Sequence, residues 1–169
     1  MHSGNHTYPF PKLTRFLPDE VATDALGAEL ARVLVPGLVI HLSGHLGAGK
    51  TALVRAMLRA LGYLGKVKSP TYTLVELYAI SRLNLYHFDF YRFNDPREWV
   101  DAGFRDYFNA ESVCLVEWPE KAGNLLPVPD LRIRLEIQDS GRLVDIEANS
   151  EAGNICLTQL LEVSSNRQT

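Results

Sequence analysis

The sequence has few cysteines, no long apolar run and no excess of positive charge. Its two cysteines, Cys114 and Cys156, form neither a C-x-x-C pair nor a metal-ligand spacing, so we expect buried structural thiols in a reducing compartment. No uninterrupted apolar stretch reaches the roughly 18 residues of a membrane span. Residues 1–10 lack the apolar core of a secretory signal. These absences predict a cytoplasmic protein with no membrane contact.

The charge balance excludes a strong general attraction to nucleic acid. Lys and Arg number 17 against 20 Asp and Glu, which gives a formal net charge of -3. Any role on RNA would therefore need a partner protein. With 169 residues, of which 46% are hydrophobic, the chain has enough apolar side chains for one compact domain.

Apolar spacing predicts the order of the elements. We expect a flexible N-terminal extension over residues 1–11, a domain over 12–162 and a flexible tail over 163–169. Helical spacing follows Pro18-Asp19 up to Pro36-Gly37, and a second helix follows a glycine-rich segment and ends near Gly62. A third helix is predicted from Asp95-Pro96 to about Tyr107. Extended segments are predicted at 13–17, 38–42, 72–78, 83–90 and 113–116, the last fully buried.

The last third of the chain has a different pattern. Apolar and polar residues alternate over 131–138, Gly141 interrupts the pattern, and alternation resumes over 144–148. This indicates an antiparallel hairpin with one face toward water. Buried runs near the front and alternating strands at the back predict an α/β fold, a single P-loop NTPase-like domain whose mixed central sheet is flanked by helices.

The strongest motif is the segment GHLGAGKT, from Gly44 to Thr51, which lies between a predicted strand and a predicted helix. Its glycines allow backbone N–H groups to converge, and the following helix adds its positive end, so the segment suits a phosphate group. We expect Lys50 to contact β- and γ-phosphates and the Thr51 hydroxyl to contact Mg²⁺. The residues expected to bind nucleotide here are Gly44, Leu46, Gly47, Ala48, Gly49, Lys50 and Thr51.

Carboxylates at two strand ends are candidates for the Mg²⁺ site. Asp89 follows one predicted strand and Glu117 follows another, and either could hold the metal directly or through water. His87 shares a side of the strand with Asp89, but we favour a hydrogen-bonded structural histidine because no third nitrogen or sulfur ligand is suitably spaced.

Thr71, in Ser69-Pro70-Thr71, could sense a γ-phosphate or belong to an ordinary turn. Arg92 could contact a phosphate or form a surface salt bridge.

Other classes of P-loop protein fit less well. A GTPase would have D-x-x-G and N-K-x-D after its P-loop, and neither occurs downstream. A small-metabolite kinase usually has an arginine-bearing lid, whereas the last third of this chain forms a hairpin. The kinase remains an alternative, as does a non-catalytic nucleotide-gated binding module.

Four motifs occur in one order: GHLGAGKT at 44–51, KSPTYTLVE at 68–76, YHFDFYRF at 86–93 and CLVEWP at 114–119. In this the chain closely resembles the TsaE family over about residues 17–142. The resemblance implies an ATPase that binds ATP or ADP with Mg²⁺, hydrolyses ATP weakly alone, and acts with the TsaB and TsaD proteins. That complex carries out N6-threonylcarbamoylation of adenosine 37 in ANN-decoding tRNAs, so contact with tRNA would be indirect.

The resemblance also implies roles for particular residues. It places metal-linked positions on Thr51, Asp89 and Glu117, a switch on 69–71, and the family's tryptophan on Trp118. Glu20 and Arg142 become expected nucleotide contacts. We therefore expect catalytic roles for Lys50, Thr71, Asp89 and Glu117: Lys50 and backbone amides hold phosphates, Thr51 and Glu117 position Mg²⁺, and Asp89 or Thr71 orients water. No strong general base stands out, which fits low basal turnover that a partner raises.

Overall fold

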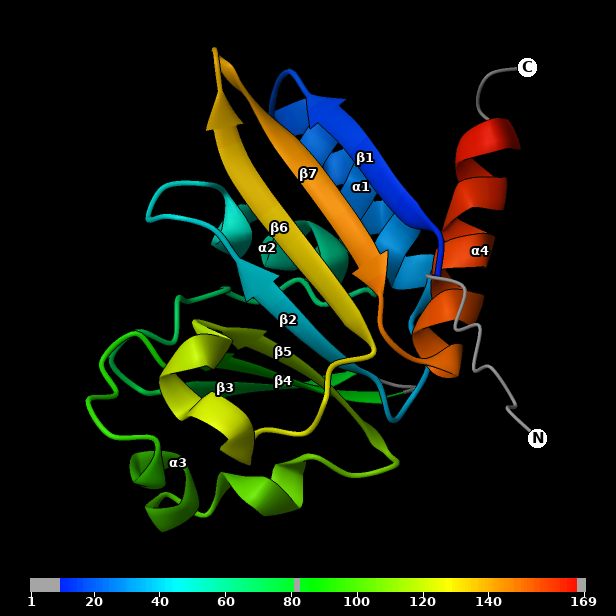
Figure 1. Cartoon of the computed structure of the whole chain (residues 1–169). Coiled ribbons are helices and arrows are strands. Elements are labelled where there is room, and N and C mark those ends of the chain that lie inside the picture. Colours follow the sequence, from blue (N-terminus) through cyan, green and yellow to red (C-terminus); the bar gives the residue numbers. More distant parts are fainter. Residues whose placement is uncertain (1–9, 81–82, 167–169) are drawn as a thin grey trace, which may run out of the picture.

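The computed structural model describes residues 10–80 and 83–166 and consists of a seven-stranded mixed sheet with helices on both faces (Figure 1). The strand order is β1-β7-β6-β2-β5-β4-β3. β2 pairs in parallel with β5 and β6, and β4 pairs in parallel with β5, whereas the remaining pairs are antiparallel. This confirms the predicted α/β fold with a mixed sheet and a late antiparallel hairpin. The strands are β1 (Lys12–Leu17), β2 (Val39–Ser43), β3 (Val75–Ile80), β4 (Leu83–Asp89), β5 (Ser112–Glu117), β6 (Leu131–Gln138) and β7 (Gly141–Ala148).

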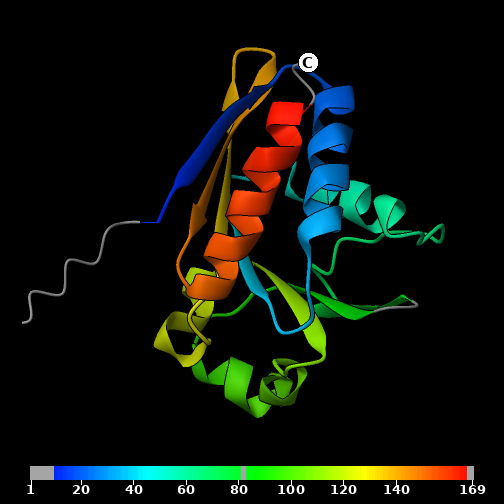
Figure 2. The same cartoon turned by 90° about the vertical axis from the view of Figure 1, so that its right-hand side faces the viewer.

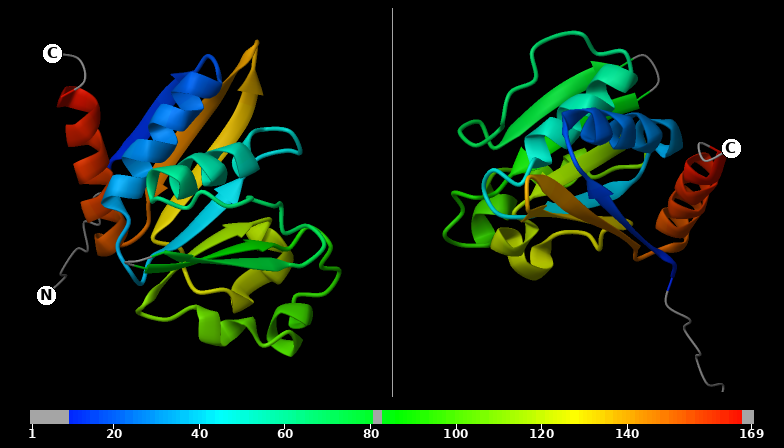
Figure 3. Two further views of the ribbon diagram at one scale, coloured as in Figure 1. Left: turned by 180° about the vertical axis from the view of Figure 1, so that it is seen from behind. Right: turned by 90° about the horizontal axis from the view of Figure 1, so that it is seen from above.

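Three long helices cover one face of the sheet (Figures 2 and 3). They are α1 (Glu20–Val33), α2 (Lys50–Ala60) and α4 (Glu151–Asn166). α1 begins where predicted, because the Asp19 side chain accepts a hydrogen bond from the Ala22 N–H at 2.9 Å. Arg15 of β1 donates to Glu29 of α1 and to Ser164 of α4, which fixes both helices on the same face.

The other face of the sheet is covered at the β4–β5 end by short helices. They are α3 (Arg97–Asp101) and the 3₁₀ helices η1 (Phe104–Tyr107) and η2 (Pro119–Leu125). Side chains alternate along β5, so Val113 and Leu115 join the core under α1 and α2. Cys114 and Val116 instead join an aromatic cluster under the short helices. The strand is buried along its whole length, as predicted.

Several predicted boundaries were wrong. The helix expected from Asp95 to Tyr107 is divided into α3 and η1, because Gly103 adopts a left-handed conformation with φ 73°. The strand expected from Tyr72 begins at Val75, since residues 70–73 form a turn in which the Leu74 N–H donates to Pro70 O at 2.7 Å.

Helix α4 was not predicted at all. It continues through residues 163–166, which lie within the predicted flexible tail. Residues 167–169 of that tail and residues 1–9 of the expected N-terminal extension lie outside the described residues. Among residues 10–80 and 83–166, no helix is long and apolar enough to cross a membrane.

Candidate functional site

The glycine-rich loop between β2 and α2 forms one wall of a cavity of about 220 Å³. Gly49, with φ 102°, is the residue before α2, and its left-handed backbone turns the loop directly into the helix. The N-terminus of α2 therefore faces the cavity, where its free N–H groups favour an anion. The cavity is lined by Leu46, Gly47, Gly49, Lys50, Thr51, Ala52, Ser69, Thr71, Asp89, Glu117 and Trp118.

Lys50 places a buried positive charge at this cavity, since its side chain is only 6% exposed. The Lys50 Nζ donates a hydrogen bond to Gly44 O at 2.5 Å and lies 3.9 Å from Glu117 Oε1. It also lies 4.4 Å from the centroid of the Trp118 ring, within the range of a cation–π interaction. The ammonium group is thus held at the loop by three neighbours.

Asp89 and Glu117 lie side by side because they are register partners at the carboxyl ends of the parallel strands β4 and β5. Both are buried. The Tyr91 N–H donates to Asp89 Oδ1 at 2.9 Å, and the Thr71 hydroxyl donates to Asp89 Oδ2 at 3.2 Å. Burial is the main cause that raises the pKa of Asp89; the two hydrogen bonds oppose this effect, whereas the neighbouring Glu117 carboxylate adds to it.

The donors present suit magnesium better than a transition metal. The Thr51 hydroxyl and the two carboxylates are hard oxygen ligands, and Mg²⁺ is usually held by one or two carboxylates together with phosphates and water. In the part of the chain that the structure describes, no three His, Cys, Asp or Glu residues form a metal-binding group. His87 instead forms a hydrogen bond with Glu117, with Nε2 and Oε2 2.7 Å apart. The expected hydrogen bond of His87 is therefore present.

A second cavity, of about 290 Å³, adjoins the first and shares Gly49 and Ala52 with it. Glu20, at the start of α1, and Arg142, on β7, both line this second cavity. Arg142 Nε donates to Ala48 O at 3.0 Å, and its Nη2 donates to Gly47 O at 3.1 Å. The two residues that only the family resemblance suggested therefore lie beside the glycine-rich loop.

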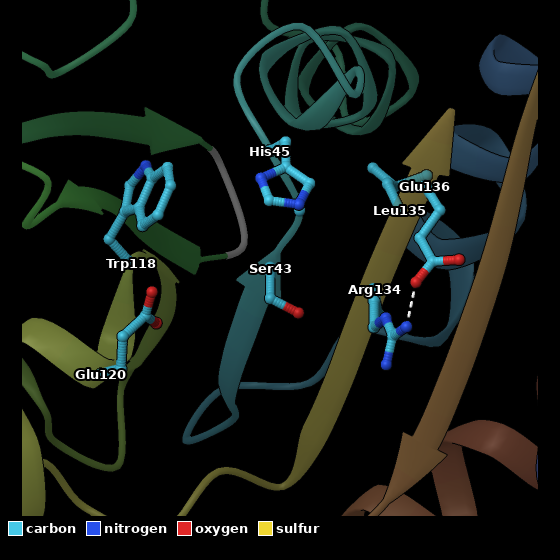
Figure 4. Close-up of a pocket in the computed structure, with 8 residues that line it drawn as sticks. Ser43, His45, Trp118, Glu120, Arg134, Leu135 and Glu136 are labelled. Atoms are coloured by element: carbon cyan, nitrogen blue, oxygen red, sulfur yellow. Dashed lines mark hydrogen bonds and ion pairs between the residues drawn. The ribbon is translucent and has the colours of Figure 1, made fainter. Parts of the chain in front are cut away.

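Trp118 lines both the first cavity and a third one of about 260 Å³. Figure 4 shows the third cavity. In the third cavity Trp118 and Glu120 lie on one side and the β6 residues Arg134 and Glu136 on the other. The Trp118 backbone is left-handed, with φ 56° and ψ 49°, and its ring packs against Tyr91 at 5.0 Å between centroids. This conformation holds the indole against Lys50.

Not every predicted residue lines the first cavity. Gly44 lines the third cavity, and its carbonyl accepts the hydrogen bond from Lys50, which lines the first cavity. Ala48 is buried and offers its carbonyl to Arg142. Arg92 packs over the ring of Tyr72 at 4.1 Å and is not among the residues that line the cavity.

Sequence reasoning missed two residues of this site. Ala52 lines both the first and the second cavity, and its place next to Thr51 in the first turn of α2 was the available signal. Tyr91 holds Asp89 through its N–H and packs on Trp118. Tyr91 lies within the motif YHFDFYRF, two residues after Asp89, and that motif was the available signal.

Comparison with known proteins identifies relatives over nearly the whole fold. Residues 17–144 match the family model described as "Threonylcarbamoyl adenosine biosynthesis protein TsaE". The "tRNA threonylcarbamoyladenosine biosynthesis protein TsaE" of Haemophilus influenzae is 43% identical over 146 residues, which cover 83% of this chain and 92% of that protein. The protein of the same name from Bacillus subtilis is 40% identical over 116 residues, covering 69% of this chain and 71% of the relative.

A solved structure has the same fold. The crystal structure of YdiB from Bacillus subtilis superposes with a TM-score of 0.80 at 28% sequence identity. The match covers 94% of this chain and 99% of that one.

Proposed function

Because the chain belongs to the TsaE family of threonylcarbamoyl adenosine biosynthesis proteins, we propose that it is the subunit that binds and hydrolyses ATP during threonylcarbamoylation of tRNA. In this proposal it acts with the TsaB and TsaD proteins on adenosine 37 of ANN-decoding tRNAs, contacts tRNA only through that complex, and turns over slowly on its own. The observation that carries the proposal is the cavity in which the glycine-rich loop, the N-terminus of α2 and two strand-end carboxylates meet.

The two adjoining cavities suggest how a nucleotide lies. The phosphates occupy the first cavity, where the loop amides and Lys50 neutralise their charge. The base and ribose extend over Gly49 and Ala52 into the second cavity, between Glu20 and Arg142. This arrangement gives ATP and ADP the same anchor and leaves the γ-phosphate at the strand ends.

In this proposal the side chains around the γ-phosphate divide the work. Thr51 and Glu117 supply oxygens for Mg²⁺, which neutralises phosphate charge when bound. Asp89 accepts a proton from the attacking water or orients it. Burial raises the pKa of Asp89, which makes its carboxylate a stronger base than that of an exposed aspartate. Thr71 donates to Asp89 and thereby links the loop at 69–71 to the same carboxylate.

Phosphate release from ATP, measured with and without TsaB, TsaD and tRNA, tests the proposal. We expect slow release by the chain alone, an increase when the partners are present, and loss of release in Glu117→Ala. A labelled product other than inorganic phosphate would indicate a kinase. Nucleotide binding without turnover, even with the partners, would indicate a nucleotide-gated binding module.

A further inference from the structure

His87 is the most deeply buried titratable side chain at the proposed active site. Its side chain is fully buried on β4, and it lies two residues before Asp89 and so on the same face of the strand. Its Nε2 lies 2.7 Å from Glu117 Oε2. Its Nδ1 is buried and has no hydrogen-bond partner among the described residues. Buried polar side chains usually have their hydrogen bonds satisfied, so the single contact of the His87 ring, with Glu117, indicates why a histidine is buried here.

The unpartnered nitrogen identifies the tautomer. An unpartnered N–H in the interior loses a full hydrogen bond with water, whereas a carboxylate offers only acceptors. Of the two neutral tautomers, the one with the lower cost therefore has its proton on Nε2, from which it is donated to Glu117 Oε2, and has a bare lone pair on Nδ1.

The contact also orients the carboxylate of Glu117. Oε2 is occupied by His87, and Oε1 lies 3.9 Å from Lys50 Nζ. Glu117 is the last residue of β5, whose side chains are all buried, so one oxygen is anchored in the interior while the other is presented beside the positive charge of Lys50. Asp89 has its own anchors, the Tyr91 N–H and the Thr71 hydroxyl.

We propose that His87 is a positioning residue, which donates its Nε2 proton to Glu117 Oε2 and so holds Oε1 toward the Mg²⁺ of a bound nucleotide. This inference rests on the proposed function. His87 touches neither the nucleotide nor the metal and acts through Glu117 alone. Groups that orient a ligand in this way change metal affinity by about 10–100-fold when removed.

Three substitutions separate the hydrogen bond from the space that the ring fills. His87→Gln keeps an amide N–H near the position of Nε2, His87→Asn keeps an amide that is too short to reach Glu117, and His87→Leu removes the donor. Binding of Mn²⁺ to the ADP-saturated protein, followed by electron paramagnetic resonance, is the readout. We expect the Asn and Leu variants to bind Mn²⁺ about 10–100-fold more weakly and the Gln variant to retain nearly the wild-type affinity.

His41→Leu is the matched control. His41 also has a buried nitrogen without a hydrogen-bond partner among the described residues. It is the register partner of Val116 on β5, so its side chain lies on the face of the sheet opposite to that of Glu117. This control variant should bind Mn²⁺ as the wild type does. Thermal unfolding of every variant shows whether the fold is intact. If His87→Leu bound Mn²⁺ at the wild-type level, or if folded Gln and Asn variants lost affinity equally, His87 would have no positioning role.

Two further measurements keep this inference distinct from the proposed function. ADP binding in the presence of EDTA should be unchanged in all three variants, because Lys50 and the loop amides remain; failure of the wild type to bind ADP would contradict the proposed function instead. The ¹⁵N shifts of the His87 ring in the wild-type protein should show a protonated Nε2 and a bare Nδ1. A proton on Nδ1 alone would overturn the inference without any substitution.

Discussion

Buried charge is concentrated at one place in this molecule. Among the described residues, six polar or charged side chains are buried, and four of them meet at the glycine-rich loop. These are Lys50, His87, Asp89 and Glu117. Removing charge from water costs free energy that only close partners offset. Apolar side chains at these positions would stabilise the fold without this cost. A charged ligand in the cavity is therefore the best explanation for the buried polar and charged side chains at the loop.

Lys50→Ala should weaken ADP binding by about 10–100-fold, because a charged hydrogen bond to phosphate contributes about 1.5–3 kcal/mol. Lys50 is also the one basic side chain among the described residues that line the first cavity. Isothermal titration calorimetry measures the change. Lys66→Ala, which removes an exposed lysine after α2, is the control and should leave affinity unchanged. Equal affinities in the two variants would remove Lys50 from the phosphate site.

His41 should make stability depend on pH. Burial, followed by repulsion from Arg132, lowers the pKa of His41 from 6.5 to about 4. Between these values the unfolded chain binds a proton that the native chain does not, so stability falls as the pH drops from about 6.5 to about 4. Urea unfolding measures how far the free energy of unfolding falls across this window. In His41→Gln this fall should be smaller than in the wild type, by up to about 3 kcal/mol. Parallel pH profiles for the two proteins would contradict the assignment.

At the scale of elements, the helix that starts at the glycine-rich loop is fixed by close packing. Gly27 of α1 faces Ala56 of α2, and a Cβ built on Gly27 would lie 2.3 Å from the Ala56 Cβ. No rotamer change relieves such an overlap, because both atoms are attached directly to helix backbones. The absence of a side chain at position 27 therefore sets how near α2, and with it Lys50, lies to α1.

Gly27→Ala should destabilise the protein by about 1–3 kcal/mol, although the same change in an exposed helix stabilises it by about 1 kcal/mol. The double variant with Ala56→Gly removes the Cβ–Cβ overlap but leaves backbone atoms of Ala56 and Met57 at 3.0 Å from the added Cβ, so it should recover part of the loss. Chemical unfolding of both single variants and the double variant gives the coupling between the two positions. Additive effects would show that the helices separate freely.

At the scale of the whole molecule, the hairpin in the last third of the chain fixes the glycine-rich loop in the first third. Arg142 of the late hairpin donates to two carbonyls of the glycine-rich loop, Gly47 O and Ala48 O. The hairpin joins the sheet through β6, which pairs in parallel with β2, the strand that leads into the loop. The strand order thus brings two segments that are distant in the sequence, the glycine-rich loop and the β6–β7 hairpin, to the same end of neighbouring strands (Figure 1).

Arg142→Ala should weaken ADP binding by about tenfold, which corresponds to about 1.4 kcal/mol, because the loop loses two hydrogen bonds that fix its conformation. Arg132→Ala, an exposed arginine on the same hairpin, is the control. Calorimetric titration with ADP and far-UV circular dichroism should show weaker binding with an unchanged fold. Wild-type affinity in Arg142→Ala would show that the loop holds its shape alone.

The sequence determined the parts that rest on local chemistry. Spacing in GHLGAGKT placed the loop between a strand and a helix, and alternation over 131–148 gave the hairpin. The same reasoning missed α4, although Cys156, Leu157 and Leu160 lie at helical spacing, which is a local signal, and are buried in the core.

Only the tertiary structure decided which carboxylates meet and what holds them. The sequence showed Asp89 and Glu117 at two strand ends, but their adjacency depends on β4 and β5 being parallel neighbours in register. The contact between His87 and Glu117, and the one between Arg142 and the loop, join residues far apart in the chain. Local spacing cannot encode such contacts, because strand order follows from how the whole apolar surface is buried.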